Sequence, residues 1–238
     1  DTARSESNAE IAAACLLVKH PISGGLTEEE AIELNVTLAD IGEPLQIDEE
    51  SFSWALKHIS RGAAPGPSGW TLECWKDACA DANISAALLA FVNATFCKDQ
   101  LPPELLEMWG ACNTVGLSKK DGGLRPISMG ETLRRLTGKA AVRQLRDKVC
   151  ETLAPLQWGV STSRGCAVIA HTARTYLHRH PDHVLLKLDI TNAFNSQSRG
   201  AFLRAVADKL PTLLPLAAQF YRVPSSLYIR DRKSTRLN

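Results

Sequence analysis

The chain has 238 residues, of which 45% are hydrophobic and 22% are charged, and its formal net charge is +1. This length and apolar content are typical of one large folded domain or two smaller ones, and they exclude a disordered or fibrous protein. No apolar run approaches the roughly 18 residues that a membrane span requires, so we expect no membrane partner. The seven cysteines form no CxxC pair, which favours a reduced, intracellular compartment over a secreted disulfide framework.

Charge is distributed unevenly along the chain. Residues 1–60 hold three Lys or Arg against twelve Asp or Glu, whereas residues 117–150 hold nine against three. On a helix that begins near residue 130, a turn of about 100° per residue places four basic side chains within an arc of about 80°: Arg135, Lys139, Arg143 and Arg146. Such a stripe is a candidate contact for a nucleic-acid backbone, although on the stripe alone a solvated helix face is the simpler explanation.

The first hundred residues predict helices. Thr27 and Glu30 have the spacing of a capping box, and acidic residues open the segment "IDEESFSWALKHIS", where the helix dipole favours them. A Gly/Pro loop at 61–69 comes next, and further helices are expected in "TLECWK", in "ISAALLAFVNATFCK" and after the pair Pro102-Pro103.

The pattern changes after residue 112. Two β-type runs, 114–118 and 124–128, flank "KKDGG", which is a strong hairpin-turn signal. Helices are expected at about 131–151 and 165–179, and two more around 198–209 and 211–222.

Between those pairs of helices lies a short aliphatic segment that carries a carboxylate. Five of the seven residues in 184–190 are aliphatic, which predicts a strand buried on both faces, yet Asp189 stands just before its end. Ionised carboxylates are rarely buried without a partner or a metal. Asp189 is therefore expected either at a strand end in a wet cleft or in contact with a ligand.

The last eight residues, 231–238, read "DRKSTRLN", which is what a common sequencing adapter encodes when it is read in frame. We therefore expect this tail to be foreign to the natural protein and exclude it from fold reasoning. It holds three positive charges and one negative, so the remainder of the chain has a formal net charge of −1.

Three segments, in this order, resemble the reverse transcriptases of non-LTR retrotransposons and related retroelements: "APGPSGW", "GLSKKDGGLRPISMGETLRRLTGKA" and "LLKLDITNAFNSQSR". The linking "LQWGVSTSRGCAVIAHTAR" is also similar, so the resemblance covers about residues 55–230. It implies an α+β, right-hand polymerase fold. Residues 1–54 would be a helical, acidic N-terminal extension, 55–180 the helix-rich fingers with a β-hairpin, and 181–230 an incomplete palm sheet with the first catalytic motif.

The resemblance also implies an RNA-directed DNA polymerase, a nucleotidyltransferase that adds dNTPs to a DNA primer on an RNA template. Asp189 would be its first catalytic aspartate and, with the Ile190 carbonyl, would bind Mg²⁺ in a two-metal site. Phe194 would exclude the 2′-OH of ribonucleotides, and Lys119 and Arg125 on the hairpin would contact the triphosphate. Without the motifs, Phe194 would be a core residue and the two cations would belong to an exposed turn.

A complete palm in this family continues with a Tyr-x-Asp-Asp hairpin, and the sequence contains no adjacent Asp-Asp pair. Because one aspartate cannot assemble a two-metal site, we expect an N-terminal fragment that is inactive by itself. The alternative is a non-catalytic RNA-binding protein, maturase-like or domesticated from a retroelement. A third interpretation is a helical interaction protein with chance motif matches, which predicts no salt-dependent RNA binding.

Overall fold

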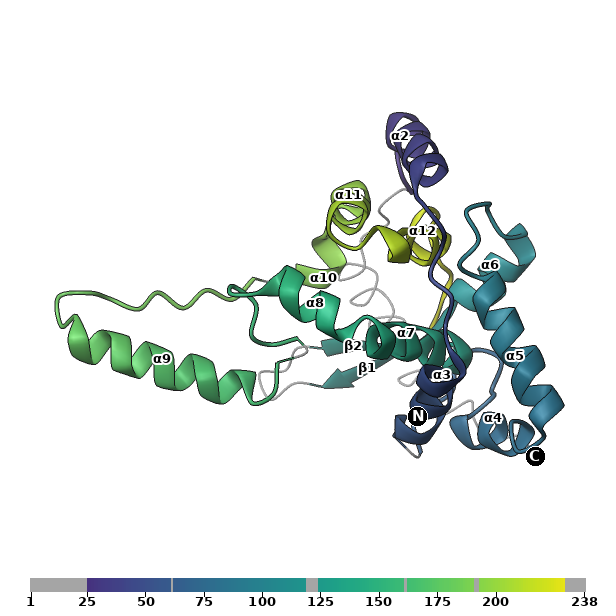
Figure 1. Ribbon diagram of the computed structural model, residues 1–238, viewed down its shortest axis with the longest axis horizontal. Helices are drawn as coiled ribbons and strands as arrows, with labels where there is room; N and C mark the ends of the chain where they lie inside the picture. The colour runs from purple at the N-terminus through teal and green to yellow at the C-terminus, as the bar shows by residue number, and fades with distance from the viewer. Residues whose placement is uncertain (1–24, 61, 119–123, 161, 191–192, 230–238) are drawn as a thin grey trace, which may run out of the picture.

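The computed structural model describes residues 25–60, 62–118, 124–160, 162–190 and 193–229. Helices dominate and a small three-stranded sheet accompanies them, while one long helix projects away from the rest (Figure 1). The first helices of the described chain are α2 (Glu28–Asp40), α3 (Glu49–His58), α4 (Leu72–Ala78), α5 (Ala82–Ala94) and α6 (Pro103–Gly110). After the β1–β2 hairpin come α7 (Thr132–Gln144), α8 (Arg146–Leu153), α9 (Gly165–Arg179), α10 (Ala193–Ser196), α11 (Arg199–Lys209), the 3₁₀ turn η1 (Pro211–Leu213) and α12 (Leu214–Tyr221).

The expected capping signals start the first two helices. The Thr27 side chain accepts a hydrogen bond from the Glu30 amide, and the Glu30 carboxylate accepts one from the Thr27 amide, so the capping box is confirmed. Asp48 caps α3 by accepting from the Ser51 amide. Because α3 runs from Glu49 to His58, the predicted domain boundary between residues 54 and 55 falls inside this helix.

The expected hairpin is present, and a third strand joins it. Strands β1 (Cys112–Ser118) and β2 (Leu124–Gly130) pair antiparallel, and β3 (Leu227–Ile229) pairs parallel to β1, so that β1 is central. A hydrogen bond of 2.9 Å between the Thr114 and Ser128 hydroxyls ties β1 to β2. The connecting "KKDGG" lies outside the described residues.

The main core lies where α3 packs on α7. Phe52 and Phe96 are fully buried there, together with Leu136 and Ala140 of α7. The prediction of one helix over 131–151 is wrong, because Leu145 leaves helical geometry at ψ 11° and separates α7 from α8. No Gly or Pro marks that break in the sequence.

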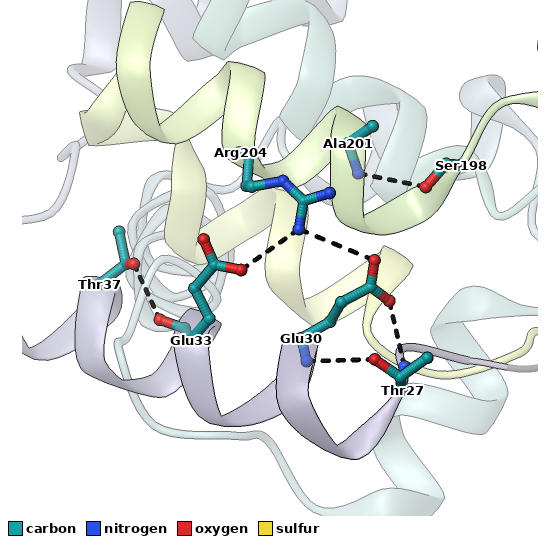
Figure 2. Close-up of polar contacts among 7 residues, drawn as sticks. All are labelled: Thr27, Glu30, Glu33, Thr37, Ser198, Ala201 and Arg204. Atoms are coloured by element: carbon teal, nitrogen blue, oxygen red, sulfur yellow. Dashed lines mark hydrogen bonds and ion pairs between the residues drawn. The ribbon is translucent and has the colours of Figure 1, made fainter.

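A second, smaller core joins the first described helix to the last ones. Leu34 and Leu38 of α2 are buried against Leu203 of α11 and Leu214 of α12. At the edge of this cluster the Arg204 guanidinium lies 3.2 Å from the Glu33 carboxylate and 3.8 Å from that of Glu30 (Figure 2). The acidic N-terminal segment is thus packed on the residues that follow Asp189 in the chain.

The prediction of a buried strand over 184–190 is wrong. Helix α9 projects outward, and the segment 181–190 runs back from its far end toward α10 without regular structure (Figure 1). All ten residues of that segment are exposed. A strand forms only where neighbours satisfy its amides and carbonyls, and β1, β2 and β3 pair with one another instead.

No helix in the described part of the chain combines the length and the apolar character that crossing a membrane requires.

Candidate nucleic-acid and nucleotide interface

The N-terminus of α7 holds the loop of the "APGPSGW" motif in place. Glu131 is 6% exposed, and its carboxylate accepts hydrogen bonds from the Ser68 amide at 2.8 Å and the Ser68 hydroxyl at 2.7 Å. Thr132 donates to the Trp70 carbonyl at 2.8 Å. A Cβ on Gly66 would lie 2.6 Å from the Glu131 Cα, so only glycine fits there. The loop is therefore a fixed part of the α7 junction.

Trp70 ends the "APGPSGW" motif, two residues before α4 begins. Its side chain is 46% exposed and packs against Trp75 of α4, with ring centroids 4.6 Å apart. Gly69, with φ +80°, turns the chain immediately before it. Trp75 in turn packs against the main core, so Trp70 lies at the edge of that core.

The four basic residues predicted to contact nucleic acid fall into two groups. Arg135 faces the loop, donating to the Ala64 carbonyl at 2.7 Å and to the Thr132 hydroxyl at 3.1 Å. The other three line one open hollow of about 700 Å³ between α3 and α7, together with Trp54, Gly138 and Val142: Lys139, Arg143 and Arg146. Arg135 therefore contacts the loop, whereas Lys139, Arg143 and Arg146 lie at the open hollow.

The hairpin presents one of its two predicted cations within the described chain. Arg125 pairs opposite Leu117 near the turn end of β2, and its side chain is exposed. Lys119 lies outside the described residues. A cation on a short two-stranded ribbon is well placed to meet a phosphate, and the role of Arg125 stays a prediction.

Asp189 and Ile190 lie in the exposed segment 181–190. Within the described residues no hydrogen bond or ion pair involves the Asp189 carboxylate, and Ile190 is 74% exposed. Phe194 belongs to α10, and its side chain lies outside the described part of the molecule. The roles of Asp189 and Ile190 as metal ligands, and of Phe194 beside the sugar, stay predictions.

The described ranges contain no cluster of metal-ligating side chains. No three His, Cys, Asp or Glu side chains come together there in a group that could hold an ion. A carboxylate and a backbone carbonyl are hard oxygen donors of the kind Mg²⁺ prefers, so Asp189 and Ile190 suit that ion chemically. The two would supply only part of a ligand set.

Sequence reasoning missed two residues that organise this surface. Glu131 ties the loop to α7, and its only sequence signal is its position immediately before the helix. Trp54 lies under Lys139 and Arg143, and its spacing of four from His58 was the available signal, since such residues share a helix face.

Comparison with known proteins gives one informative match. No protein-family model matches the chain. Over 158 residues, or 66% of this chain, the sequence is 28% identical to the retrotransposable element SLACS 132 kDa protein of Trypanosoma brucei gambiense. The match covers 13% of that protein, so the chain spans a small part of its relative's length. This distant similarity supports an origin in a retrotransposable element.

Proposed function

We propose that the chain is the fingers region and the start of the palm of a retroelement RNA-directed DNA polymerase of the non-LTR type. The observation that carries the proposal is the segment 184–190, where the Asp189 carboxylate, without an ion-pair or hydrogen-bond partner among the described residues, stands among aliphatic side chains that are 66–91% exposed. Exposed apolar runs of this kind mark surfaces that another part of a protein covers. The match to a retrotransposon protein and the ordered motifs support the same conclusion.

In this proposal Asp189 and the Ile190 carbonyl supply part of the ligand set for Mg²⁺, which neutralises charge on the transferring phosphates when it is bound. Arg125 and Lys119 add positive charge from the hairpin, and Phe194 limits the space beside the sugar. The segment 184–190 becomes a central strand when the remaining palm strands pair with it. Its exposed carboxylate would then lie at a strand end in the cleft.

Primer extension on poly(rA)/oligo(dT) with Mg²⁺ tests this function. The 238 residues alone should incorporate no dNTP above background. The longest reading frame that contains them should incorporate dNTPs, and Asp189→Asn should lower that activity by a factor of about 1,000 or more, since a lost metal ligand removes several kcal/mol of transition-state stabilisation. Asp182→Asn is the matched control, because this neighbouring carboxylate is also exposed and has no assigned ligand. Full activity of Asp189→Asn would refute the polymerase assignment.

A second candidate function is RNA binding without catalysis, in a maturase-like or domesticated protein. The observation that favours it is the basic hollow between α3 and α7, which is formed entirely by described residues. It predicts that the longest reading frame binds RNA in a salt-dependent manner yet incorporates no dNTP. Incorporation that depends on Asp189 would exclude it.

A further inference from the structure

The hollow between α3 and α7 has an aromatic floor and basic walls. Trp54 comes from α3, and the other lining residues come from α7 and the first position of α8: Gly138, Lys139, Val142, Arg143 and Arg146. Val142 is 47% exposed, and Gly138 has open space where a Cβ would stand. An apolar floor beneath cations suits a ligand that combines flat rings with phosphates.

Trp54 holds two of these cations in position. The Lys139 ammonium lies 5.5 Å and the Arg143 guanidinium 5.4 Å from the Trp54 ring centroid. The His58 ring stacks on the Trp54 ring at 4.3 Å with an interplanar angle of 16°, and Lys139 also donates to the His58 carbonyl. Two long side chains that usually move freely are thus restrained over one ring, which lowers the entropy lost when they bind an anion.

The counter-ion in this hollow is weakly held. Glu50 of α3 lies 3.9 Å from Arg143, and its side chain is 87% exposed. Among the described residues no carboxylate lies within ion-pair distance of Lys139 or Arg146. An exposed pair of this length contributes at most about 1 kcal/mol, so an incoming phosphate can replace Glu50.

The spacing of the cations suits a strand. Lys139 and Arg143 are four residues apart on α7, which corresponds to a rise of about 6 Å, and Arg146 continues the row beyond the break at Leu145. A linear series of cations meets successive phosphates of a backbone, whereas a single small anion would use only one or two of them.

We propose that this hollow binds the phosphodiester backbone of a single-stranded nucleic acid, with Trp54 as the residue that positions Lys139 and Arg143 and Glu50 as the counter-ion that the strand displaces. The proposal rests on the proposed function only in assigning nucleic acid to this chain. The charge pattern of the sequence predicted a nucleic-acid contact on α7 alone. The proposal extends that contact surface to α3, and to Trp54 in particular.

Filling the hollow is the cleanest test, because it removes no existing contact. In the full chain, Gly138→Leu should weaken the binding of a labelled single-stranded RNA, measured by fluorescence anisotropy, by about tenfold, because the added side chain keeps the phosphodiester backbone away from one or two of the cations. Gly138→Ala is the matched control: it has the same gain in helix propensity and little added volume, and it should change affinity less than about twofold. Equal binding by the two variants would overturn the proposal.

Two substitutions should move affinity in opposite directions. Trp54→Leu should weaken binding by about tenfold through the loss of both cation–π contacts, and Trp54→Phe should restore much of it. Glu50→Gln should strengthen binding by about threefold, because the competing carboxylate is gone. A Trp54→Leu variant with a native melting temperature and unchanged affinity would contradict the positioning role, and so would a Glu50→Gln variant that binds more weakly.

Salt dependence separates a phosphate contact from a change in fold. Arg146→Gln should lower the slope of log K against log salt by about 0.7, which is the value for one phosphate on a single strand. Lys148→Gln removes a charge from the same helix outside the hollow and should leave that slope unchanged. Equal slopes for Arg146→Gln and the unaltered chain would count against the contact.

The choice of strand tests the ligand class. Single-stranded RNA and DNA of one sequence should both bind and both lose affinity in Gly138→Leu, and any preference between them identifies the natural strand. A duplex that binds more tightly than either, or a linear polyphosphate that binds equally well and ignores Trp54→Leu, would refute the proposal. Primer extension with Asp189→Asn tests the polymerase assignment independently. A wrong proposal for the hollow can therefore be distinguished from a wrong polymerase assignment.

Discussion

The loop held by α7 and the segment beyond α9 both carry motifs on which the resemblance to reverse transcriptases rests, yet their surroundings differ completely. At the first, the Glu131 carboxylate accepts two hydrogen bonds from Ser68, and the Thr132 hydroxyl donates to the Trp70 carbonyl. At the second, Val184 and Leu186 are 91% and 76% exposed. The difference indicates that the loop motif is completed by contacts within this chain, whereas the Asp189 segment needs a cover that the described residues do not provide.

The largest effect is expected where the loop meets α7. Gly66→Ala places a Cβ 2.6 Å from the Glu131 Cα and 2.7 Å from its amide nitrogen, and both are backbone atoms. We expect the free energy of unfolding to fall by about 3 kcal/mol, at the upper end of overpacking effects. Urea denaturation measures it. Gly42→Ala is the control, since nothing lies within 4 Å of a Cβ there, and equal loss in both variants would show that the approach to Glu131 is unimportant.

A smaller loss is expected from the polar part of the same junction. Ser68→Ala removes the hydroxyl that donates to the Glu131 carboxylate at 2.7 Å and leaves the amide contact intact. Because hydrogen bonds to charged groups contribute about 1.5–3 kcal/mol, the free energy of unfolding should fall by about 2 kcal/mol. Ser60→Ala, at an exposed position after α3, provides the baseline for urea denaturation. No difference between the two variants would contradict the role of Glu131.

The alkylation rates of two cysteines compare a packed position with an exposed one, and no substitution is needed. Burial raises the pKa of the Cys112 thiol in β1, so its thiolate forms only at higher pH than usual. The hydrogen bond from Thr71 is the main reason that the pKa of the exposed Cys74 is lowered, which increases its thiolate at neutral pH. At pH 7.5 iodoacetamide should therefore alkylate Cys74 much faster than Cys112, as peptide mass spectrometry can follow. Similar rates would mean that β1 opens readily.

The smallest effect on stability is expected in the exposed segment. Leu186→Ser should change the free energy of unfolding of this chain by less than about 0.5 kcal/mol, the usual range for surface substitutions, while reducing aggregation. In the longest reading frame, the same substitution should lower the free energy of unfolding by about 2–5 kcal/mol, because there the side chain would be buried. It should also reduce primer-extension activity. A large loss in the short chain would mean that the segment already packs against the body.

Local signals predicted most of the helices. The capping box at Thr27, the acidic start of α3, the Pro pair before α6 and the bounds of α9 all follow from interactions within a few residues. The β-runs on either side of "KKDGG" likewise form the β1–β2 hairpin. These features depend on backbone capping and turn geometry, which neighbours in sequence decide.

The break at Leu145 and the exposed state of 184–190 did not follow from such signals. Both depend on what lies next to a residue in space: the aliphatic run has the composition of a buried strand, yet composition cannot supply pairing partners. The packing of the acidic α2 on α11, with Arg204 beside Glu30 and Glu33, was equally hidden, because it joins segments about 170 residues apart.

The sequence by itself determined most of the helical segments, the hairpin and the ordered motifs that agree with an origin in a retrotransposable element, because these depend on short-range chemistry and on residue identity. Only the tertiary structure decided how the basic residues divide, with Arg135 bound to the loop and Lys139 and Arg143 held over Trp54. The physical reason is that the direction of a long charged side chain is chosen by its partners, and Trp54 and Ala64 lie on segments that only folding brings to α7.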